Sequence, residues 1–316
     1  MELFQKLTQR KLLLVTGKGG IGKSFLSASI GQWLADSGLK VCLVEAVSQE
    51  QLSLNFGLKE SGHYLTQITP NLFGINLNSD DNFKDFIVKH LGLHKLFNKV
   101  FRKPIVKSLV KLIPGIVEMT LLGRLYYFCE IHKDPEFDIV IFDGFSTGHF
   151  FSLLQTPDAI INSGMVGPVI TETIKVRDYL LTPKVGIILA TLGEDLAVDE
   201  CLELAEKLKE PGFPNLDMIL INKKPNSLPE EALDSGLEEH EKAAFIQCWQ
   251  RLSADHDRFH HAYQSLANKI QLLYQNQHDA PMLVLAKDLG LAYPGDKSAS
   301  QIAQWFHIDP LQDHIS

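Results

Sequence analysis

The chain has 316 residues, of which 45% are hydrophobic and 22% are charged, and its formal net charge at pH 7 is −8. These values are those of an ordinary globular protein with room for one large domain or two small ones. The acidic balance argues against a general nucleic-acid-binding protein, and no apolar run of about 18 residues predicts a membrane-spanning helix.

An apolar run, a glycine-rich turn and a helical pattern follow one another near the N-terminus. Leu12–Val15 predicts a buried strand and Phe25–Leu34 predicts a helix. Between them, Gly17–Ser24 fits the phosphate-binding pattern G-x-x-x-x-G-K-[ST]. The glycines let successive backbone N–H groups turn inward around a polyphosphate at the positive end of the following helix. Lys23 would reach the β- and γ-phosphates, and the Ser24 hydroxyl would hold Mg²⁺.

The rest of the chain alternates apolar runs of strand length with helical patterns. The runs that predict strands are Lys40–Glu45, Leu72–Leu77, Phe137–Asp143, Val185–Ala190, Leu216–Asn222 and Met282–Leu285. Residues 80–132 and 237–278 instead have helical spacing. Continuous apolar strands that alternate with helices predict a parallel sheet covered on both faces. We therefore expect one α/β domain over residues 1–316, with a doubly wound, mostly parallel sheet and a helical insertion at residues 80–132.

Residues 95–113 are the most basic stretch of this insertion, with Lys and Arg alternating with apolar side chains. Three interpretations stay open for it. The first is an ordinary helix with its apolar face in the core, and the second is a surface that binds a partner or client helix. The third is an amphipathic helix that makes a peripheral contact with an acidic membrane surface.

Asp143 stands at the carboxyl end of a predicted core strand, which is where open α/β sheets bind ligands. In phosphate-loop enzymes such an Asp orients Mg²⁺. The turn Thr147-Gly148-His149 follows and would sense the γ-phosphate. The alternatives are a helix N-cap for Asp143 and a capping histidine for His149.

The segment that begins at Asn222 bears on the choice of base. Asn222-Lys223-Lys224-Pro225 is similar to the guanine motif N-K-x-D. The last position of that motif must accept hydrogen bonds from the guanine N–H groups, and Pro225 cannot do so. Pro225 therefore argues against GTP, and the alternative for Asn222 is a simple turn residue after the strand.

Together, the loop Gly17–Ser24 and the segment from Asp143 to Thr147-Gly148-His149 resemble the anion-transporting ATPase family. That family includes the arsenical-pump ATPase and the ATPase that targets tail-anchored proteins. Pro114–Glu118 and the strand that ends in Asn222 also match, so the resemblance covers nearly the whole chain. Further short segments resemble the paired bacterial members, which are encoded as two related subunits: Leu43–Glu45, Leu154–Pro157 and Val166–Pro168.

The resemblance implies a dimeric ATPase that closes around ATP and Mg²⁺ and acts on a protein client. Lys18 resembles the lysine that, in dimerising ATPases, crosses the interface to the partner's nucleotide. The partner would be a second copy or a related ATPase subunit. Ser24 and Asp143 would hold the metal. The residues implied in nucleotide binding are Gly17, Lys18, Gly19, Gly20, Ile21, Gly22, Lys23, Ser24, Phe25 and Asn222.

One position departs from the family pattern. Val47 stands where members that hydrolyse ATP well carry an Asp that positions the attacking water. Two residues earlier, Glu45 either reaches the metal or the water, or caps the end of its strand. The catalytic candidates are thus Lys18, Glu45 and Asp143. Because phosphoryl transfer depends on positioning and charge, we expect ATP binding with weak turnover.

Three functions follow from these residues. The first is a nucleotide-driven switch that hydrolyses ATP slowly, and the second is a non-catalytic ATP-binding regulatory subunit of a hetero-oligomer. The third, a small-molecule kinase, is disfavoured by Lys18 and by the turn at Thr147–His149.

The cysteines lie far apart, at positions 42, 129, 201 and 248, and form no C-x-x-C pair. Their spacing predicts neither a zinc site nor a redox motif. The cysteine cluster that the resemblance to the arsenical-pump ATPase would imply has no counterpart here, so we expect a substrate other than arsenite. The first residues, Met1–Lys6, lack the apolar segment of a signal peptide. We therefore expect a cytoplasmic protein with reduced thiols.

Overall fold

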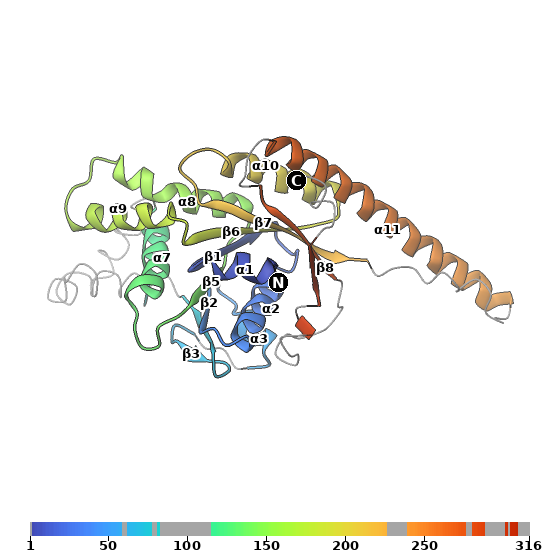
Figure 1. Cartoon of the computed structure of the whole chain (residues 1–316), viewed down its shortest axis with the longest axis horizontal. Helices are drawn as coiled ribbons and strands as arrows, with labels where there is room; N and C mark the ends of the chain where they lie inside the picture. The colour runs from blue at the N-terminus through green and yellow to red at the C-terminus, as the bar shows by residue number, and fades with distance from the viewer. Residues whose placement is uncertain are drawn as a thin grey trace.

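The computed structural model describes residues 2–58, 62–77, 81–82, 115–225, 239–275, 280–287, 301–302 and 304–308. These residues form one sheet with helices on both faces (Figure 1). Its strands are β1 (Leu12–Gly17), β2 (Val41–Glu45), β3 (Thr66–Gln67), β4 (Leu72–Asn76), β5 (Ile139–Asp143), β6 (Val185–Leu192), β7 (Asn215–Lys224), β8 (Met282–Lys287) and β9 (Phe306–Ile308).

The strand order is β3-β4-β2-β5-β1-β6-β7-β8-β9. Neighbouring strands are parallel from β4 to β8, and β3 and β9 add to the two edges in antiparallel orientation. Strand β1 lies between β5 and β6, with Val15 opposite Asp143 and Gly17 opposite Ala190. The carboxyl ends of these three strands therefore meet at one edge, as the sequence predicted for a mostly parallel α/β fold.

Alternate residues of the central strands supply two separate cores, one on each face of the sheet. Leu13 and Val15 pack with helices α1 (Glu2–Thr8), α2 (Lys23–Asp36) and α3 (Leu52–Asn55). Leu12 and Leu14 face the opposite core. The elements of that core are α7 (Ile116–Tyr126), the π-helical turn η3 (Tyr127–Ile131), α8 (Thr147–Ile161), α9 (Pro168–Leu180), α10 (Asp195–Leu208) and α11 (Glu239–Leu273). Both faces are covered, which explains why the strands are continuous apolar runs.

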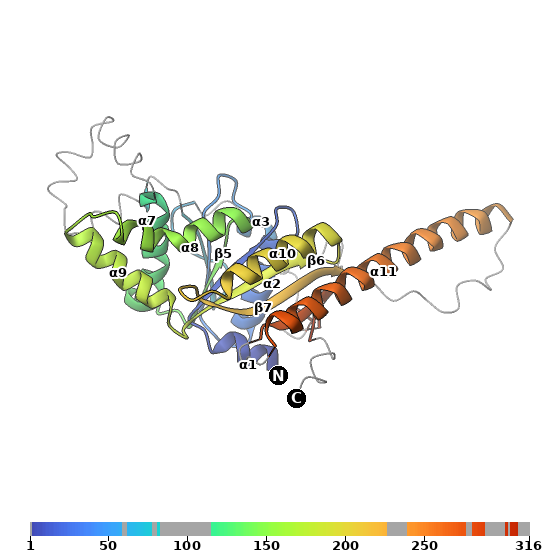
Figure 2. The same ribbon diagram turned by 90° about the horizontal axis from the view of Figure 1, so that it is seen from above.

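Helix α11 has 35 residues and extends well beyond the sheet (Figures 1 and 2). Its later part is amphipathic: Phe259, Ala262, Tyr263, Leu266 and Ile270 are buried at helical spacing. Between residues 246 and 258 no side chain is buried. The predicted long helix is confirmed, and among its described side chains those that pack on the body lie in its later half.

Residues 83–114 lie outside the described part of the chain, and with them the basic stretch 95–113. The end of the predicted insertion is described, and it is helical as α7 and η3. The insertion as a unit, and the three interpretations of its basic stretch, stay predictions.

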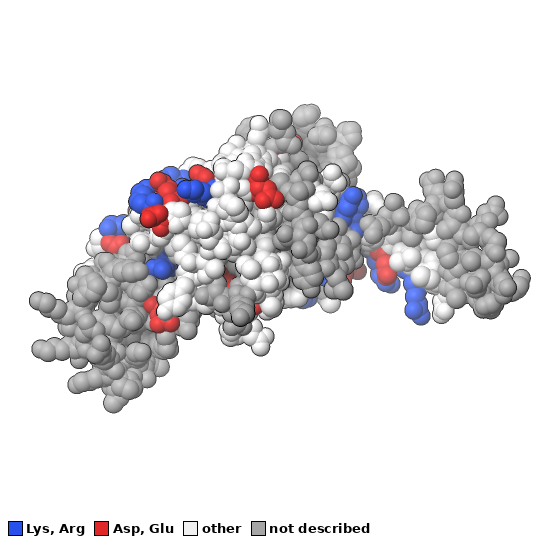
Figure 3. All heavy atoms as spheres, turned by 90° about the horizontal axis from the view of Figure 1, so that it is seen from below, with Lys and Arg blue, Asp and Glu red and all other residues white. Residues whose placement is uncertain are grey.

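Within the described ranges, no helix combines the length and the apolar character needed to cross a membrane. Figure 3 shows the molecule from below, where described Lys and Arg side chains lie interspersed with Asp and Glu.

Candidate nucleotide site

The loop between β1 and α2 has a conformation that requires glycine at two positions. Gly17 and Gly22 have φ angles of 149° and 93°, a region that other L-residues rarely adopt. A Cβ on Gly17 would lie 2.2 Å from the carbonyl oxygen of Ala190 in β6, and one on Gly22 would lie 2.6 Å from Nδ2 of Asn222 in β7. The loop is thus packed directly against the carboxyl ends of β6 and β7.

Helix α2 presents its N-terminus and an ammonium group to the space inside the loop. The N-cap residue, Gly22, has no side chain that could cap the helix. The first N–H groups and the positive end of the helix dipole are therefore available to an anion. Nζ of Lys23 donates to the carbonyl oxygens of Gly17 at 3.1 Å and Lys18 at 3.0 Å. Burial lowers the pKa of Lys23, while Asp143 and Glu200 act in the opposite direction. A helix N-terminus and an ammonium group thus lie together at this loop, and both favour a negative charge.

A buried carboxylate meets two hydroxyl groups of α2 next to this loop. Oγ of Ser24 donates to Oδ2 of Asp143 at 2.5 Å, and Oγ of Ser27 donates to Oδ1 at 3.3 Å. Burial raises the pKa of Asp143, and the bond from Ser24 partly offsets that rise. Carboxylate and hydroxyl oxygens are hard ligands of the kind that Mg²⁺ takes, usually with water and phosphate oxygens. Ser24 and Asp143 therefore fit a magnesium ion.

The segment after β5 joins the loop strand to α7. The hydroxyl of Thr16 donates to the carbonyl oxygen of Phe145 at 2.9 Å. The ring of Phe145 stacks on that of His149, with centroids 4.0 Å apart. Nε2 of His149 lies 3.8 Å from Oε1 of Glu118 in α7. A contiguous set of contacts thus runs from β1 to the described end of the predicted insertion.

Glu45 occupies a different environment from that of a metal ligand. It is fully buried at the end of β2, opposite Asp143 of β5. Its carboxylate accepts hydrogen bonds from the backbone N–H groups of Gln51 and Leu52 at 3.1–3.4 Å. Burial raises the pKa of Glu45 to about 7. The carboxylate caps the start of α3 here, and its part in catalysis stays a prediction.

Val47 lies on the surface, with 39% of its area exposed. Its backbone N–H donates to Oδ1 of Asn76 at 3.1 Å, and its carbonyl oxygen accepts from Nδ2 of the same side chain at 3.0 Å. The segment is therefore held in place by its backbone, and its side chain offers no polar atom to a water molecule.

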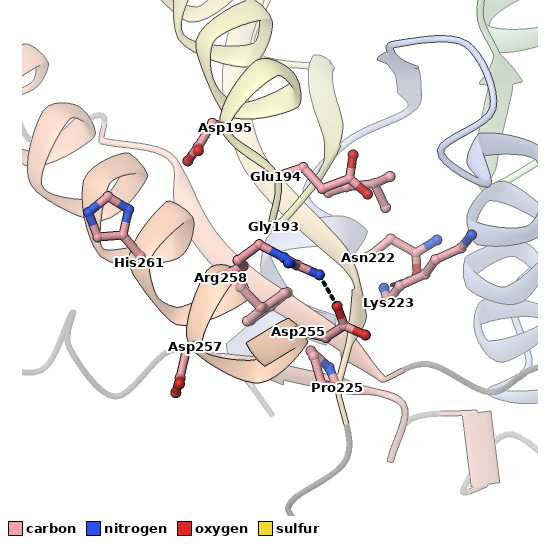
Figure 4. Close-up of a pocket in the computed structure, with 12 residues that line it drawn as sticks. Gly193, Glu194, Asp195, Asn222, Lys223, Pro225, Asp255, Asp257, Arg258 and His261 are labelled. Atoms are coloured by element: carbon pink, nitrogen blue, oxygen red, sulfur yellow. Dashed lines mark hydrogen bonds and ion pairs between the residues drawn. The ribbon is translucent and has the colours of Figure 1, made fainter. Parts of the chain in front are cut away.

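Asn222 lies between the loop and a cavity of about 770 Å³ (Figure 4). Its Nδ2 donates to the carbonyl oxygen of Ile21 at 2.8 Å, and its Oδ1 accepts from the N–H of Lys223 at 2.9 Å. Glu194 at the start of α10 and Arg258 of α11 line the same cavity. The cavity has room for a planar base and a sugar beside the loop.

Sequence reasoning missed two contributors to this region. Oε2 of Glu200 in α10 lies 3.6 Å from Nζ of Lys18, and its Oε1 accepts a hydrogen bond from the Thr147 hydroxyl. The cavity wall formed by α11, which includes Arg258, was also missed. No motif marks either of them, because the contacts join segments that are distant in sequence. The helical spacing of buried residues in α10 could only have placed Glu200 at the edge of the buried face.

Comparison with known proteins identifies the family. The model of the anion-transporting ATPase family matches residues 10–167, which is half of the chain. The matched region contains the loop, Glu45, Asp143 and the segment up to His149.

Three individual relatives have sequence identities to this chain of between 23% and 27%. ATPase BagA of Mycobacterium tuberculosis is 27% identical over 226 residues, which cover 69% of this chain and 66% of BagA. ATPase GET3B of Arabidopsis thaliana is 24% identical over 64% of this chain and 52% of its own length. ATPase ARSA1 of Chlamydomonas reinhardtii is 23% identical over 64% of this chain and 28% of its own length. The chain thus spans about two thirds of BagA, about half of GET3B and less than a third of ARSA1. Because the family model matches half of the sequence, the chain belongs to the anion-transporting ATPase family.

Proposed function

We propose that this protein binds Mg·ATP at the loop between β1 and α2 and hydrolyses it slowly, as a switch that acts on a client or partner. The observation that carries the proposal is the convergence of Lys23, Ser24 and Asp143 at one end of the sheet. Membership of an ATPase family and relatives named as ATPases support the same chemistry. The loop and Lys23 would bind the phosphates, and Ser24 and Asp143 would hold Mg²⁺, which neutralises charge on the reacting phosphate.

The base and ribose would occupy the cavity beside Asn222. Its two polar ends already bond to Ile21 and Lys223, so Asn222 fixes the wall of the cavity relative to the loop. Among the described residues that line the cavity, Lys223 and Arg258 are cations and four are acidic: Glu194, Asp195, Asp255 and Asp257. That excess of negative charge suits a neutral base and sugar better than a phosphate.

Dimerisation is the second part of the proposal. Lys18 is about half exposed at the mouth of the loop, where it can reach a nucleotide on a partner. The partner would be a second copy of this chain or a related subunit, and the client would be a protein.

The alternative is a non-catalytic ATP-binding subunit that regulates a related ATPase. The observation that favours it is the absence of a free carboxylate near the second strand, among the described residues. The side chain of Val47 offers no oxygen, and the carboxylate of Glu45 accepts hydrogen bonds from the N–H groups of Gln51 and Leu52.

Nucleotide binding and turnover test the two functions. Lys23→Ala removes the ammonium that would contact the phosphates, and we expect it to weaken ATP binding about 10- to 100-fold. Lys40→Ala, at an exposed lysine before β2, is the control and should bind normally. Turnover by the wild type that is lost in Lys23→Ala supports an ATPase, whereas ATP binding without turnover supports the regulatory subunit. A wild type that binds no ATP would contradict both.

Dimerisation needs its own measurement. We expect Lys18→Ala to bind ATP but to stay monomeric in ATP, by light scattering, if Lys18 acts across the interface. Dimers that form equally well with and without Lys18 would rule out that role.

A further inference from the structure

The carboxylate of Glu200 contacts two groups at the mouth of the loop, and its charge acts on a third. Its Oε2 lies 3.6 Å from Nζ of Lys18. Its Oε1 accepts a hydrogen bond from the hydroxyl of Thr147, the first residue of α8. Its negative charge also acts on Lys23, whose ammonium lies inside the loop. The loop, through Lys18, and the turn Thr147-Gly148-His149, through Thr147, therefore both contact α10 within one chain.

The helix that carries Glu200 is fixed in place. Val198, Cys201 and Leu202 flank it in sequence and are buried in the core of that face. Glu200 itself keeps about a third of its side chain exposed. Because the helix backbone is anchored by apolar packing and Lys18 is about half exposed, we expect the side chain of Lys18 to change position on ligand binding, and α10 to stay.

The three groups on which Glu200 acts are those that an anion at this place would attract. Two are ammonium groups and one is a hydroxyl, all donors. The terminal phosphate of ATP carries the same sign of charge as the carboxylate and, in the proposed function, is bound by Lys23. ADP lacks that phosphate, so it would leave the contacts of Glu200 in place.

We infer that Glu200 is a positioning residue that substitutes for the terminal phosphate in the nucleotide-free chain. It keeps Lys18 on its own subunit until ATP displaces the Glu200 carboxylate. This inference rests on the proposed function, because it assumes that the loop binds nucleotide. Release of Lys18 by ATP, and not by ADP, would make dimerisation depend on the terminal phosphate. Because only ATP has to displace it, Glu200 would weaken the binding of ATP relative to that of ADP.

Removal of the charge on Glu200 tests this. We expect Glu200→Gln to bind β,γ-imido-ATP about fivefold more tightly than the wild type. The variant has no ion pair with Lys18 to break and no carboxylate to repel the terminal phosphate. The affinity for ADP should change less than twofold. The ATP concentration that half-saturates dimerisation should fall in parallel. Glu203→Gln, on an exposed residue of the same helix, is the matched control and should behave as the wild type.

Repeating Glu200→Gln in a variant without Lys18 distinguishes two effects of Glu200: its hold on Lys18 and its direct repulsion of the phosphate. In Lys18→Ala, the further change Glu200→Gln should alter β,γ-imido-ATP affinity less than twofold, because the contact is already absent. An equal gain for both nucleotides, or the same gain with and without Lys18, would overturn the inference.

The outcomes distinguish this inference from the proposed function. Normal ATP binding by the wild type, with Glu200→Gln indistinguishable from Glu203→Gln, would overturn the inference alone. A wild type that binds neither nucleotide would overturn both.

Discussion

At the scale of single residues, two acidic side chains lie side by side at the ends of neighbouring strands. Glu45 of β2 is opposite Asp143 of β5, and each is at least nine-tenths buried. Burial raises the pKa of both groups, and Asp143 adds to the rise at Glu45. Buried ionisable groups with shifted pKa values are common at functional sites. A bound cation next to Asp143 would offset that unfavourable charge.

Asp143→Asn is expected to separate function from stability. The substitution removes the buried charge but keeps an acceptor for the serine hydroxyls, so the free energy of unfolding should be unchanged or higher. Mg²⁺-dependent turnover should fall about 100-fold or more, because the metal loses its carboxylate. The measurements are denaturant unfolding and turnover over a Mg²⁺ titration.

The control for this prediction is Asp138→Asn, just before the same strand, where an exposed carboxylate accepts a bond from the N–H of Lys40. It should leave Mg²⁺ dependence as in the wild type. An Asp143→Asn variant with normal Mg²⁺-dependent turnover would remove Asp143 from the metal site.

The raised pKa of Glu45 predicts that the stability of the protein depends on pH. Its pKa is about 7 in the folded chain against an ordinary value of 4.5, so between these values the folded state binds more protons than the unfolded state. The free energy of unfolding should therefore fall as pH rises from 4.5 to 7, by up to about 3 kcal/mol. Glu45→Gln removes the titration while keeping an acceptor for Gln51 and Leu52. Urea unfolding at pH 5 and pH 8 should show a smaller difference in the variant, and an equal difference would contradict the assignment.

At the scale of elements, the strands that build the site could be predicted and the edges of the sheet could not. The runs that became β1, β2 and β5 are continuous and apolar because helices cover both their faces. The edge strands β3 and β9 have two and three residues, too few to show a period. Their existence depends on pairing with β4 and β8, which the sequence does not display.

The same contrast applies to the site. Gly17–Ser24 and Asp143 could be predicted because their chemistry lies in a local motif with a strand before it. The bond from Thr147 to Glu200 joins residues 53 apart, and no local pattern encodes it. The environment of Glu45 was left open for a related reason, since it depends on how the backbone returns at Gln51 and Leu52.

The contact between α11 and Gly193, the residue that follows β6, yields an element-scale prediction. A Cβ on Gly193 would lie 2.2 Å from Cδ2 of Phe259, and Phe259 is the first buried residue described in α11. Gly193→Ala should therefore displace α11 at the cavity wall and destabilise the protein by about 1–3 kcal/mol. Adenine nucleotide affinity should fall as well, if the base binds there.

A double variant checks the cause. Phe259→Leu shortens the side chain that the new methyl group meets, so the two changes together should be less destabilising than the sum of each alone. Strict additivity, measured by urea unfolding, would mean that Gly193 acts elsewhere.

At the scale of the whole molecule, the two ends of the sheet carry different groups: the candidate nucleotide site at one end and a buried ion pair at the other. The carboxyl ends of β1, β5 and β6 carry the loop and Asp143. At the amino ends, Arg10 before β1 donates from Nε and Nη2 to the carboxylate of Asp217 in β7, with both bonds at 2.6 Å. A Cβ on Gly186 of β6 would lie 1.8 Å from that carboxylate. The pair therefore passes over β6 only because position 186 is glycine, and it joins strands that are not neighbours.

Asp217→Asn should leave the arginine, which keeps only 10% of its side chain exposed, without its charged partner. An unpaired buried charge costs about 3–5 kcal/mol, so the midpoint of urea unfolding should fall accordingly. The nucleotide site lies at the opposite ends of the strands, and ATP affinity measured well below that midpoint should match the wild type. Arg10→Met with Asp217→Leu removes both charges and should recover most of the stability. If the double variant is no more stable than Asp217→Asn, the loss comes from packing around Gly186 and not from the unpaired arginine.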